Sequence, residues 1–198
     1  MAALSTSREF THTPTSLTLL WLFVSLPLVA WDSLYVFLRP HSMPGGFLHS
    51  PIWVPYALYG NVDHMYGLKQ WEAGNGFTAA QSALNVMETL MYAYYLAVWW
   101  GNKDANGGIK GSKGAKAALM GYSAAVMTVS KTALYWLNEY YSGFDNIGQN
   151  DMWSLFFLWI IPNGAWLVVP TFGMIFPMWS EIVDGLTFGP SGGRTKKE

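Results

Sequence analysis

Four stretches of the chain are almost free of charge, and each is long enough to form a membrane-spanning helix. They cover residues 17–38, 76–100, 117–138 and 152–180; the first three contain one charged residue each and the fourth contains none. A helix needs about 20 mostly apolar residues to cross a bilayer. We therefore predict an all-α fold, namely a four-helix transmembrane bundle.

The segments between these stretches differ in composition. Residues 102–114 are rich in Gly, Lys and Asn, which is typical of a flexible connection. Residues 39–74 are rich in Pro, Gly and aromatic residues, so we expect an ordered lumenal cap with an interfacial helix around 51–60. The first stretch lacks a small-residue cleavage site and is too long for a secretory signal, so it is expected to remain as an anchor. The predicted parts are an N-terminal tail, a membrane domain and a C-terminal tail, over 1–16, 17–180 and 181–198.

Lysine and arginine residues are shared unequally between the two ends of this bundle. Cytoplasmic loops carry an excess of them, so the richer end predicts the cytosolic side. Both termini and the loop between the second and third stretches are therefore expected in the cytosol. The richer end holds Arg8, Lys103, Lys110, Lys113, Lys116, Arg194, Lys196 and Lys197, whereas the other end holds Arg39 and Lys69.

Composition narrows the possible functions. Charged residues make up 12% of the chain, about half the share of a soluble domain. The net charge of -1 provides no basic surface for nucleic acid, so no nucleic-acid partner is expected. The absence of Cys excludes disulfides, thiolate catalysis and Cys-based metal sites. The 11 Trp and 11 Tyr residues suit the two membrane interfaces.

Three ionisable residues fall inside the predicted spans: Asp32, Glu88 and Lys131. Such residues are costly in lipid and normally face the bundle interior, which makes them functional candidates. At a rise of about 1.5 Å per residue, all three lie roughly 20–24 Å from the cytosolic ends of their helices. They are therefore expected to share one layer.

Other polar residues extend this layer into stripes with helical spacing of three and four residues. In a desolvated pocket two carboxyls repel each other, so one keeps its proton and the pair can act as acid and base. Trp faces could stabilise a cationic intermediate or bind a hydrophobic amine. Pro162 and Gly164 are expected to loosen the fourth helix and free backbone carbonyls. The stripes are Thr78, Gln81, Asn85, Glu88 and Tyr92; Thr128, Lys131, Tyr135 and Asn138; and Asn163 with Trp166.

Four segments in order resemble the EXPERA superfamily. This superfamily includes the sigma-2 receptor and the emopamil-binding protein, which is a sterol delta-8/delta-7 isomerase. They are AWDSLYVFLRP (30–40), GNGFTAAQSALNVMET (74–89), ALYWLNEYYSGF (133–144) and IPNGAWLVVP (161–170). The resemblance covers roughly 26–178.

The resemblance implies roles for individual residues. Asp32 and Glu88 fall where the family has its two acidic residues. Asn163 and Trp166 match the isomerase's Asn and the Trp that faces a carbocation, and Tyr135 matches a Tyr. Two positions depart from the isomerase: Leu28 stands where it has a His, and Lys131 lies where it has Gly then Asp.

The leading functional prediction is a membrane-embedded sterol or terpenoid double-bond isomerase of the endoplasmic reticulum, with Glu88 and Asp32 as catalytic acid and base. Substrate-binding candidates are Trp166, Asn163, Tyr135, Lys131, Tyr92 and Asn85. The expected partners are a sterol or other hydrophobic polycyclic ligand and the lipid bilayer. No cofactor or metal is expected, and formation of a homodimer is left as an open alternative.

Several alternatives remain. The chain could be a non-catalytic sterol- or amine-binding regulator resembling the sigma-2 receptor, or an isomerase or cyclase of specialised metabolism. Asp32 and Glu88 could simply join two helices by hydrogen bonds, Lys131 could reach toward the interface, and Gln81 with Asn85 could be inter-helix contacts. Asp63 and His64 fit no zinc pattern and are expected on a solvated surface.

Overall fold

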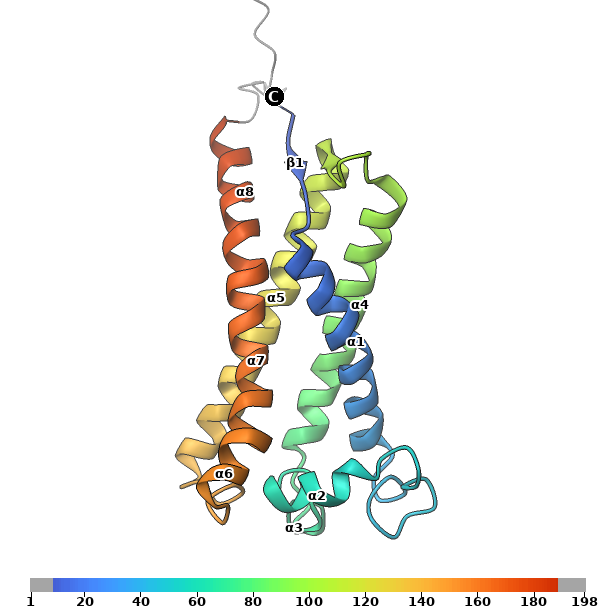
Figure 1. Ribbon diagram of the computed structural model, residues 1–198, viewed down its shortest axis with the longest axis vertical. Helices are drawn as coiled ribbons and strands as arrows, with labels where there is room; N and C mark the ends of the chain where they lie inside the picture. Colours follow the sequence, from blue (N-terminus) through green and yellow to red (C-terminus); the bar gives the residue numbers. More distant parts are fainter. Residues whose placement is uncertain (1–8, 189–198) are drawn as a thin grey trace, which may run out of the picture.

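The computed structural model describes residues 9–188 and is mostly helical (Figure 1). Each of the four predicted stretches forms a long helix. The first three are α1 (Ser16–Phe37), α4 (Phe77–Asn102) and α5 (Gly111–Tyr141). The fourth begins at Met152 and continues to Phe188, past the predicted boundary at Ser180. The all-α prediction is confirmed, whereas Arg8, Arg194, Lys196 and Lys197 lie outside the described residues.

The fourth helical run contains two π-helical turns. Its parts are α6 (Met152–Leu155), η1 (Phe156–Ile160), α7 (Ile161–Pro170), η2 (Thr171–Ile175) and α8 (Phe176–Phe188). A proline ring clashes with the carbonyl four residues earlier and removes that hydrogen bond. Pro162 and Pro177 therefore disturb the carbonyls of Leu158 in η1 and Gly173 in η2. The Gly173 carbonyl instead accepts a hydrogen bond from the Thr18 hydroxyl of α1 at 2.8 Å.

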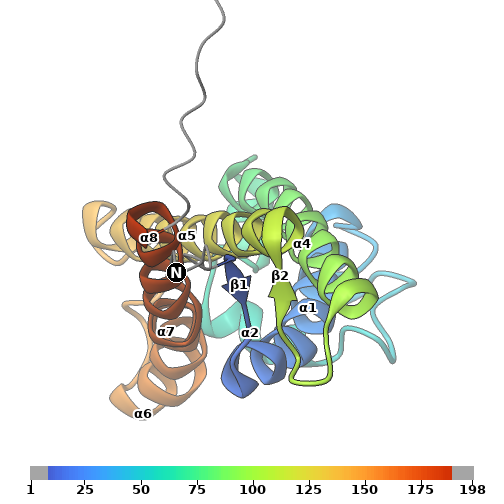
Figure 2. The same cartoon turned by 90° about the horizontal axis from the view of Figure 1, so that it is seen from above.

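The helices do not enclose the bundle interior evenly. α4 packs against α1 on one side and α5 on the other, and α5 packs against α7, η2 and α8 (Figures 1 and 2). Contacts between α1 and the fourth helical run occur near the start of α1. There Trp21 meets Trp166 edge-on, with ring centroids 5.0 Å apart, and Leu17 lies against Gly173. Farther along α1 the two helices are separated by the cavity described below.

The end of the bundle near the N-terminal segment is closed by a short strand pair. β1 (Thr11–His12) pairs antiparallel with β2 (Ile109–Lys110). Buried His12 lies within 2.5 Å of Glu181 in α8 and 2.9 Å of the Tyr95 hydroxyl in α4. The loop expected to be flexible over 102–114 is therefore anchored at Ile109 and Lys110, because these residues pair with a strand from the N-terminal tail.

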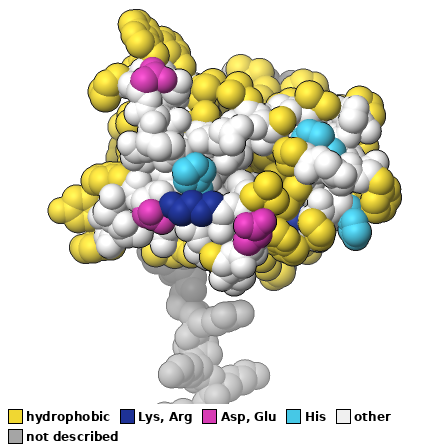
Figure 3. All heavy atoms as spheres, turned by 90° about the horizontal axis from the view of Figure 1, so that it is seen from below, with side chains coloured by type: hydrophobic (Ala, Val, Ile, Leu, Met, Phe, Trp, Pro, Cys, Tyr) yellow, Lys and Arg dark blue, Asp and Glu magenta, His cyan; other side chains and the backbone are white. Residues whose placement is uncertain are grey.

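The opposite end carries the predicted ordered cap. The expected interfacial helix is α2 (Pro55–Val62), and α3 (Leu68–Glu72) follows it. Buried Arg39 ties the cap to α4, because its guanidinium donates to the Thr78 hydroxyl at 2.7 Å and to the Met65 carbonyl at 3.3 Å. Viewed from this end, a group of charged and His side chains lies near the middle, other His side chains lie toward one edge, and apolar side chains are gathered mainly around the rim (Figure 3).

The long helices point large apolar side chains outward and polar side chains inward. Phe23, Leu90 and Phe172 are more than half exposed, whereas Thr78, Asn85, Glu88 and Thr128 are buried. Two segments, Ser16–Phe37 and Met152–Thr187, are long and apolar enough to cross a membrane by length and composition, and only a minority of each is buried inside the molecule. α4 and α5 do not meet this criterion; α4 contains the polar stripe, and α5 begins with Gly and Lys residues.

Candidate functional site

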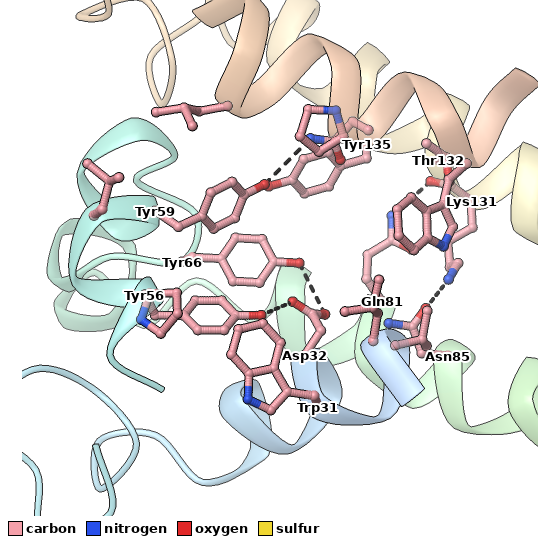
Figure 4. A pocket seen from close by; sticks show the side chains of 18 residues that line it. Trp31, Asp32, Tyr56, Tyr59, Tyr66, Gln81, Asn85, Lys131, Thr132 and Tyr135 are labelled. Atoms are coloured by element: carbon pink, nitrogen blue, oxygen red, sulfur yellow. Dashed lines mark hydrogen bonds between the residues drawn. The ribbon is translucent and has the colours of Figure 1, made fainter. Parts of the chain in front are cut away.

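A cavity of about 450 Å³ lies between α1, the cap and the helices α4, α5 and α7 (Figure 4). Its walls are mainly aromatic and aliphatic, with a few polar side chains. This volume is within the range of about 300–1,000 Å³ that is usual for small-molecule sites. Six of the eight predicted site residues line it: Asp32, Asn85, Lys131, Tyr135, Asn163 and Trp166.

The cavity opens toward the outside between α1 and α7. Leu28 of α1 and Leu58 of α2 line it and are 45% and 60% exposed, and Pro162 of α7 is also exposed. Leu28 occupies the position where the resemblance implies a His. An apolar ligand can therefore enter sideways between two helices.

Asp32 is the carboxyl that faces the cavity. The Tyr56 hydroxyl donates a hydrogen bond to its Oδ1 at 2.5 Å, and the Tyr66 hydroxyl donates to its Oδ2 at 3.4 Å (Figure 4). The Tyr56 ring stacks on the Tyr35 ring of α1 with centroids 3.7 Å apart, which fixes the hydroxyl in place. Burial raises the pKa of Tyr56 and Tyr66 well above their usual value, so both hydroxyls keep their protons as donors.

Glu88 lies behind the cavity wall rather than in it. It is buried, and its Oε2 is 3.2 Å from the Lys131 ammonium, which also donates to Asn85 Oδ1. Lys131 thus forms an ion pair with Glu88 inside the bundle. The expectation that two carboxyls face one ligand is wrong. Among residues 9–188, Glu88 does not line the cavity, because Lys131 and Asn85 lie between it and the open space.

Tyr92 is also outside the cavity. It is buried in the apolar cluster around Leu22 and Tyr95, and its hydroxyl is 2.9 Å from the Thr128 hydroxyl. Its polar tip therefore serves the α4–α5 contact. The polar stripe of α4 continues past the end of the cavity, so helical spacing alone overestimated the site.

The fourth helical run contributes Asn163 and Trp166 to the wall. The Asn163 amide donates to the Trp159 carbonyl at 2.9 Å and to the Tyr59 hydroxyl of α2 at 3.5 Å. The Trp159 carbonyl lies within the distorted stretch before Pro162, as the sequence led us to expect for this region. Trp166 is held by its edge contact with Trp21.

Asp63 is part of the structure around the site, a role that the sequence did not indicate. It has no exposed surface, and its Oδ2 accepts hydrogen bonds from the Tyr135 hydroxyl at 2.5 Å and from Trp159 Nε1 at 2.8 Å. The expectation of a solvated Asp63 was wrong because two helices supply these donors. Burial raises its pKa to about 6, against the lowering effect of the donors. Asp63 thereby fixes Tyr135 at the cavity wall.

Four aromatic residues of the wall were missed individually: Trp31, Tyr56, Tyr59 and Tyr66. Three come from the cap, whose aromatic content already indicated an ordered segment. The i, i+3 spacing of Tyr56 and Tyr59 in PYALYG could have placed both on one face of a short helix.

The arrangement can hold an apolar ligand against one carboxyl and stabilise positive charge with aromatic faces. Among residues 9–188, no group of three or more His, Cys, Asp or Glu side chains is placed to hold a metal ion. Comparisons with known family models, curated proteins and solved structures gave no match for this chain.

Proposed function

We propose that the chain is a four-span membrane protein that isomerises a double bond in a sterol or related polycyclic terpenoid. The observation that carries the proposal is Asp32: one carboxyl, held by two phenol hydroxyls, in an aromatic cavity open between two helices. The resemblance to the EXPERA superfamily, predicted from sequence, supports the same chemistry.

The membrane part of the proposal rests on the distribution of polarity. Besides the two segments that meet the length and composition criterion, α4 and α5 expose Leu90, Trp100, Leu119 and Leu134 on their outer faces. Large contiguous apolar surfaces are rare on soluble monomers, whereas a bilayer covers them. We place the protein in the endoplasmic reticulum with both termini cytosolic; glycosylation acceptor sequences inserted at Gly46 or at Gly107 would report which loop is lumenal.

A single carboxyl is sufficient for the reaction. Protonated Asp32 gives its proton to one alkene carbon, so a C–H bond forms, the π bond breaks and a carbocation is left beside a carboxylate. The carboxylate then removes a proton from the carbon on the other side of the cation. This forms the shifted double bond and regenerates the acid, with no net gain or loss of electrons or protons.

The surroundings of Asp32 favour the intermediate. The Tyr56 and Tyr66 hydroxyls point at the oxygens on which negative charge develops, and such fixed donors stabilise a transition state without reorganisation. Trp31 and Trp166 line the same space, and their ring faces attract a cation. Glu88 has no direct role in this scheme; it neutralises Lys131.

Complementation of a yeast strain that lacks its own sterol delta-8/delta-7 isomerase tests this proposal. Sterols are read by mass spectrometry after expression of the wild type, Asp32→Asn and the control Asp184→Asn, which changes an exposed carboxyl on α8. Delta-7 sterols are expected with the wild type and the control only. Conversion by Asp32→Asn at the wild-type level would refute the role of Asp32.

The second candidate is a binding protein for hydrophobic amines. It is favoured by the same single carboxylate among aromatic rings, since an ammonium group can pair with Asp32 and lie against the rings. A tertiary alkylamine and its carbon isostere distinguish the two functions. Tight, Asp32-dependent binding of the amine by a protein that converts no sterol would favour the binding protein.

A further inference from the structure

One side of the cavity, away from the tyrosines that surround Asp32, is built from amide and ammonium groups. Gln81, Asn85 and Lys131 lie together there, with Asp32 between them and the tyrosines of the cap (Figure 4). Gln81 and Asn85 are one turn apart on α4, so both face the same way.

The hydrogen bond made by Gln81 fixes which way its amide points. Its Nε2 donates to the backbone carbonyl of Lys131 at 3.1 Å. A carbonyl can only accept, so the nitrogen must face it and Oε1 must face away. This Oε1 is buried and has no hydrogen-bond partner within residues 9–188. A buried acceptor left without a donor is destabilising, and a ligand that supplies the donor removes that cost.

The neighbouring groups leave one hydrogen-bond donor for a ligand, besides the acceptor on Gln81. The Asn85 amide donates to Ser33 at 3.3 Å, and the Lys131 ammonium is directed at Asn85 and Glu88. An ammonium has three N–H donors, so one is left after those two contacts. Lys131 lines the cavity in front of Glu88, so the positive end of this ion pair disfavours a second cation at this side.

We infer that this side of the cavity recognises a hydroxyl group of the ligand, with Gln81 Oε1 as the acceptor of its proton and Lys131 as a donor to its oxygen. A ketone offers no proton to Gln81, a hydrocarbon offers nothing, and an ammonium group would be repelled. The inference rests on the proposed function and narrows it: the substrate is a monohydroxylated polycycle, bound with its ring system toward Asp32 and the tyrosines.

Three matched probes test the inference: cholestan-3β-ol, cholestan-3-one and cholestane. The full chain is reconstituted in nanodiscs, and each probe displaces tritiated cholestanol. The wild type is expected to prefer the alcohol over the ketone by about tenfold, the value of one hydrogen bond in a buried site. Gln81→Met, which has a similar shape without the acceptor, is expected to lower alcohol affinity about tenfold and leave the ketone unchanged. The control Leu84→Met, on the outer face of α4, is expected to change neither.

The outcomes separate the inference from the function on which it rests. If the wild type binds alcohol and ketone equally, the hydroxyl inference is overturned while a polycycle-binding site remains. If Gln81→Met keeps the full preference for the alcohol, Gln81 is not the acceptor. If the chain binds none of the three probes, the proposed function itself fails. The comparison of probes on the wild type needs no variant, so it holds even if Gln81→Met does not fold.

Discussion

The ion pair between Lys131 and Glu88 should be the most sensitive polar contact inside the bundle. Both side chains are almost fully inside, 10% and 4% exposed, with the ammonium 3.2 Å from Oε2. Replacing Lys131 with Met removes one charge and leaves the other without its partner. Removing one member of a buried pair typically costs about 3–5 kcal/mol.

The cost has an upper limit, because Glu88 can escape by taking up a proton. An ordinary glutamic acid titrates near 4.3, so protonating it costs about 4 kcal/mol at pH 7 and about 1 kcal/mol at pH 5. We therefore expect Lys131→Met to lose about 3–4 kcal/mol of unfolding free energy at pH 7 and about 1 kcal/mol at pH 5. Adding Glu88→Gln removes the stranded charge, so the double variant should recover most of the loss at pH 7.

The measurement is chemical unfolding in mixed micelles of a mild detergent and dodecyl sulfate, followed by Trp fluorescence. Lys69→Met is the matched control, since Lys69 pairs with Asp145 at 2.8 Å but both are about half exposed. Exposed pairs contribute roughly 0–1 kcal/mol. The reasoning is refuted if Lys131→Met costs no more than Lys69→Met, or if the double variant is as unstable as the single one.

Three further predictions follow from other contacts. Tyr56→Phe should lower the isomerisation rate by about 10- to 100-fold, the value of a hydrogen bond to a charged group. Tyr66→Phe should lower it less, because the Tyr66 hydroxyl is 3.4 Å from Asp32 whereas the Tyr56 hydroxyl is 2.5 Å away. Equal effects of the two variants in sterol conversion assays would contradict this. Burial raises the pKa of Asp63 from 3.8 to about 6, so its protonation stabilises the native state fully below pH 3.8, and this stabilisation is lost as the pH rises through 6. The free energy of unfolding should therefore fall by about 3 kcal/mol over this range, and thermal unfolding of Asp63→Asn should lack that pH dependence. Gly121→Leu should destabilise the protein by about 1–3 kcal/mol, because a Cβ added there would lie 2.9 Å from Met178 Cε. Gly164→Leu should not, because a Cβ added there would meet no atom of residues 9–188 within 4 Å.

Sequence was sufficient for the helices because their signal is local. Charge-free stretches and helical spacing depend on neighbours three and four residues away, and the polar stripes correctly brought Asn85, Lys131 and Asn163 to one cavity. The disturbed stretch before Pro162 was predictable for the same reason, since the proline acts on the preceding turn.

The parts that were missed depend on distant partners. Asp63 is buried because Tyr135 and Trp159, 72 and 96 residues later, donate to it. Glu88 is excluded from the cavity because Lys131 of another helix occupies the space in front of it. Neither fact leaves a trace in the local pattern, so a polar stripe identifies the inward face of a helix without showing where the cavity along that face ends.

The way the polar groups of the cavity pair with one another decides which of them act on a ligand. Tyr135 is bound to Asp63, and Asn163 is bound to the carbonyl of Trp159. Groups that are already paired hold the walls in place, and a ligand gains little by competing for them. Asp32, the Oε1 atom of Gln81 and the remaining N–H of Lys131 are left for a ligand: a carboxyl held by donors, an acceptor with no donor among residues 9–188, and a donor beyond the contacts with Asn85 and Glu88. A polycycle with one hydroxyl and one alkene meets all three needs at once, whereas a hydrophobic amine meets only the first. The ratio of alcohol to amine affinity is therefore the quantity that separates the two candidate functions.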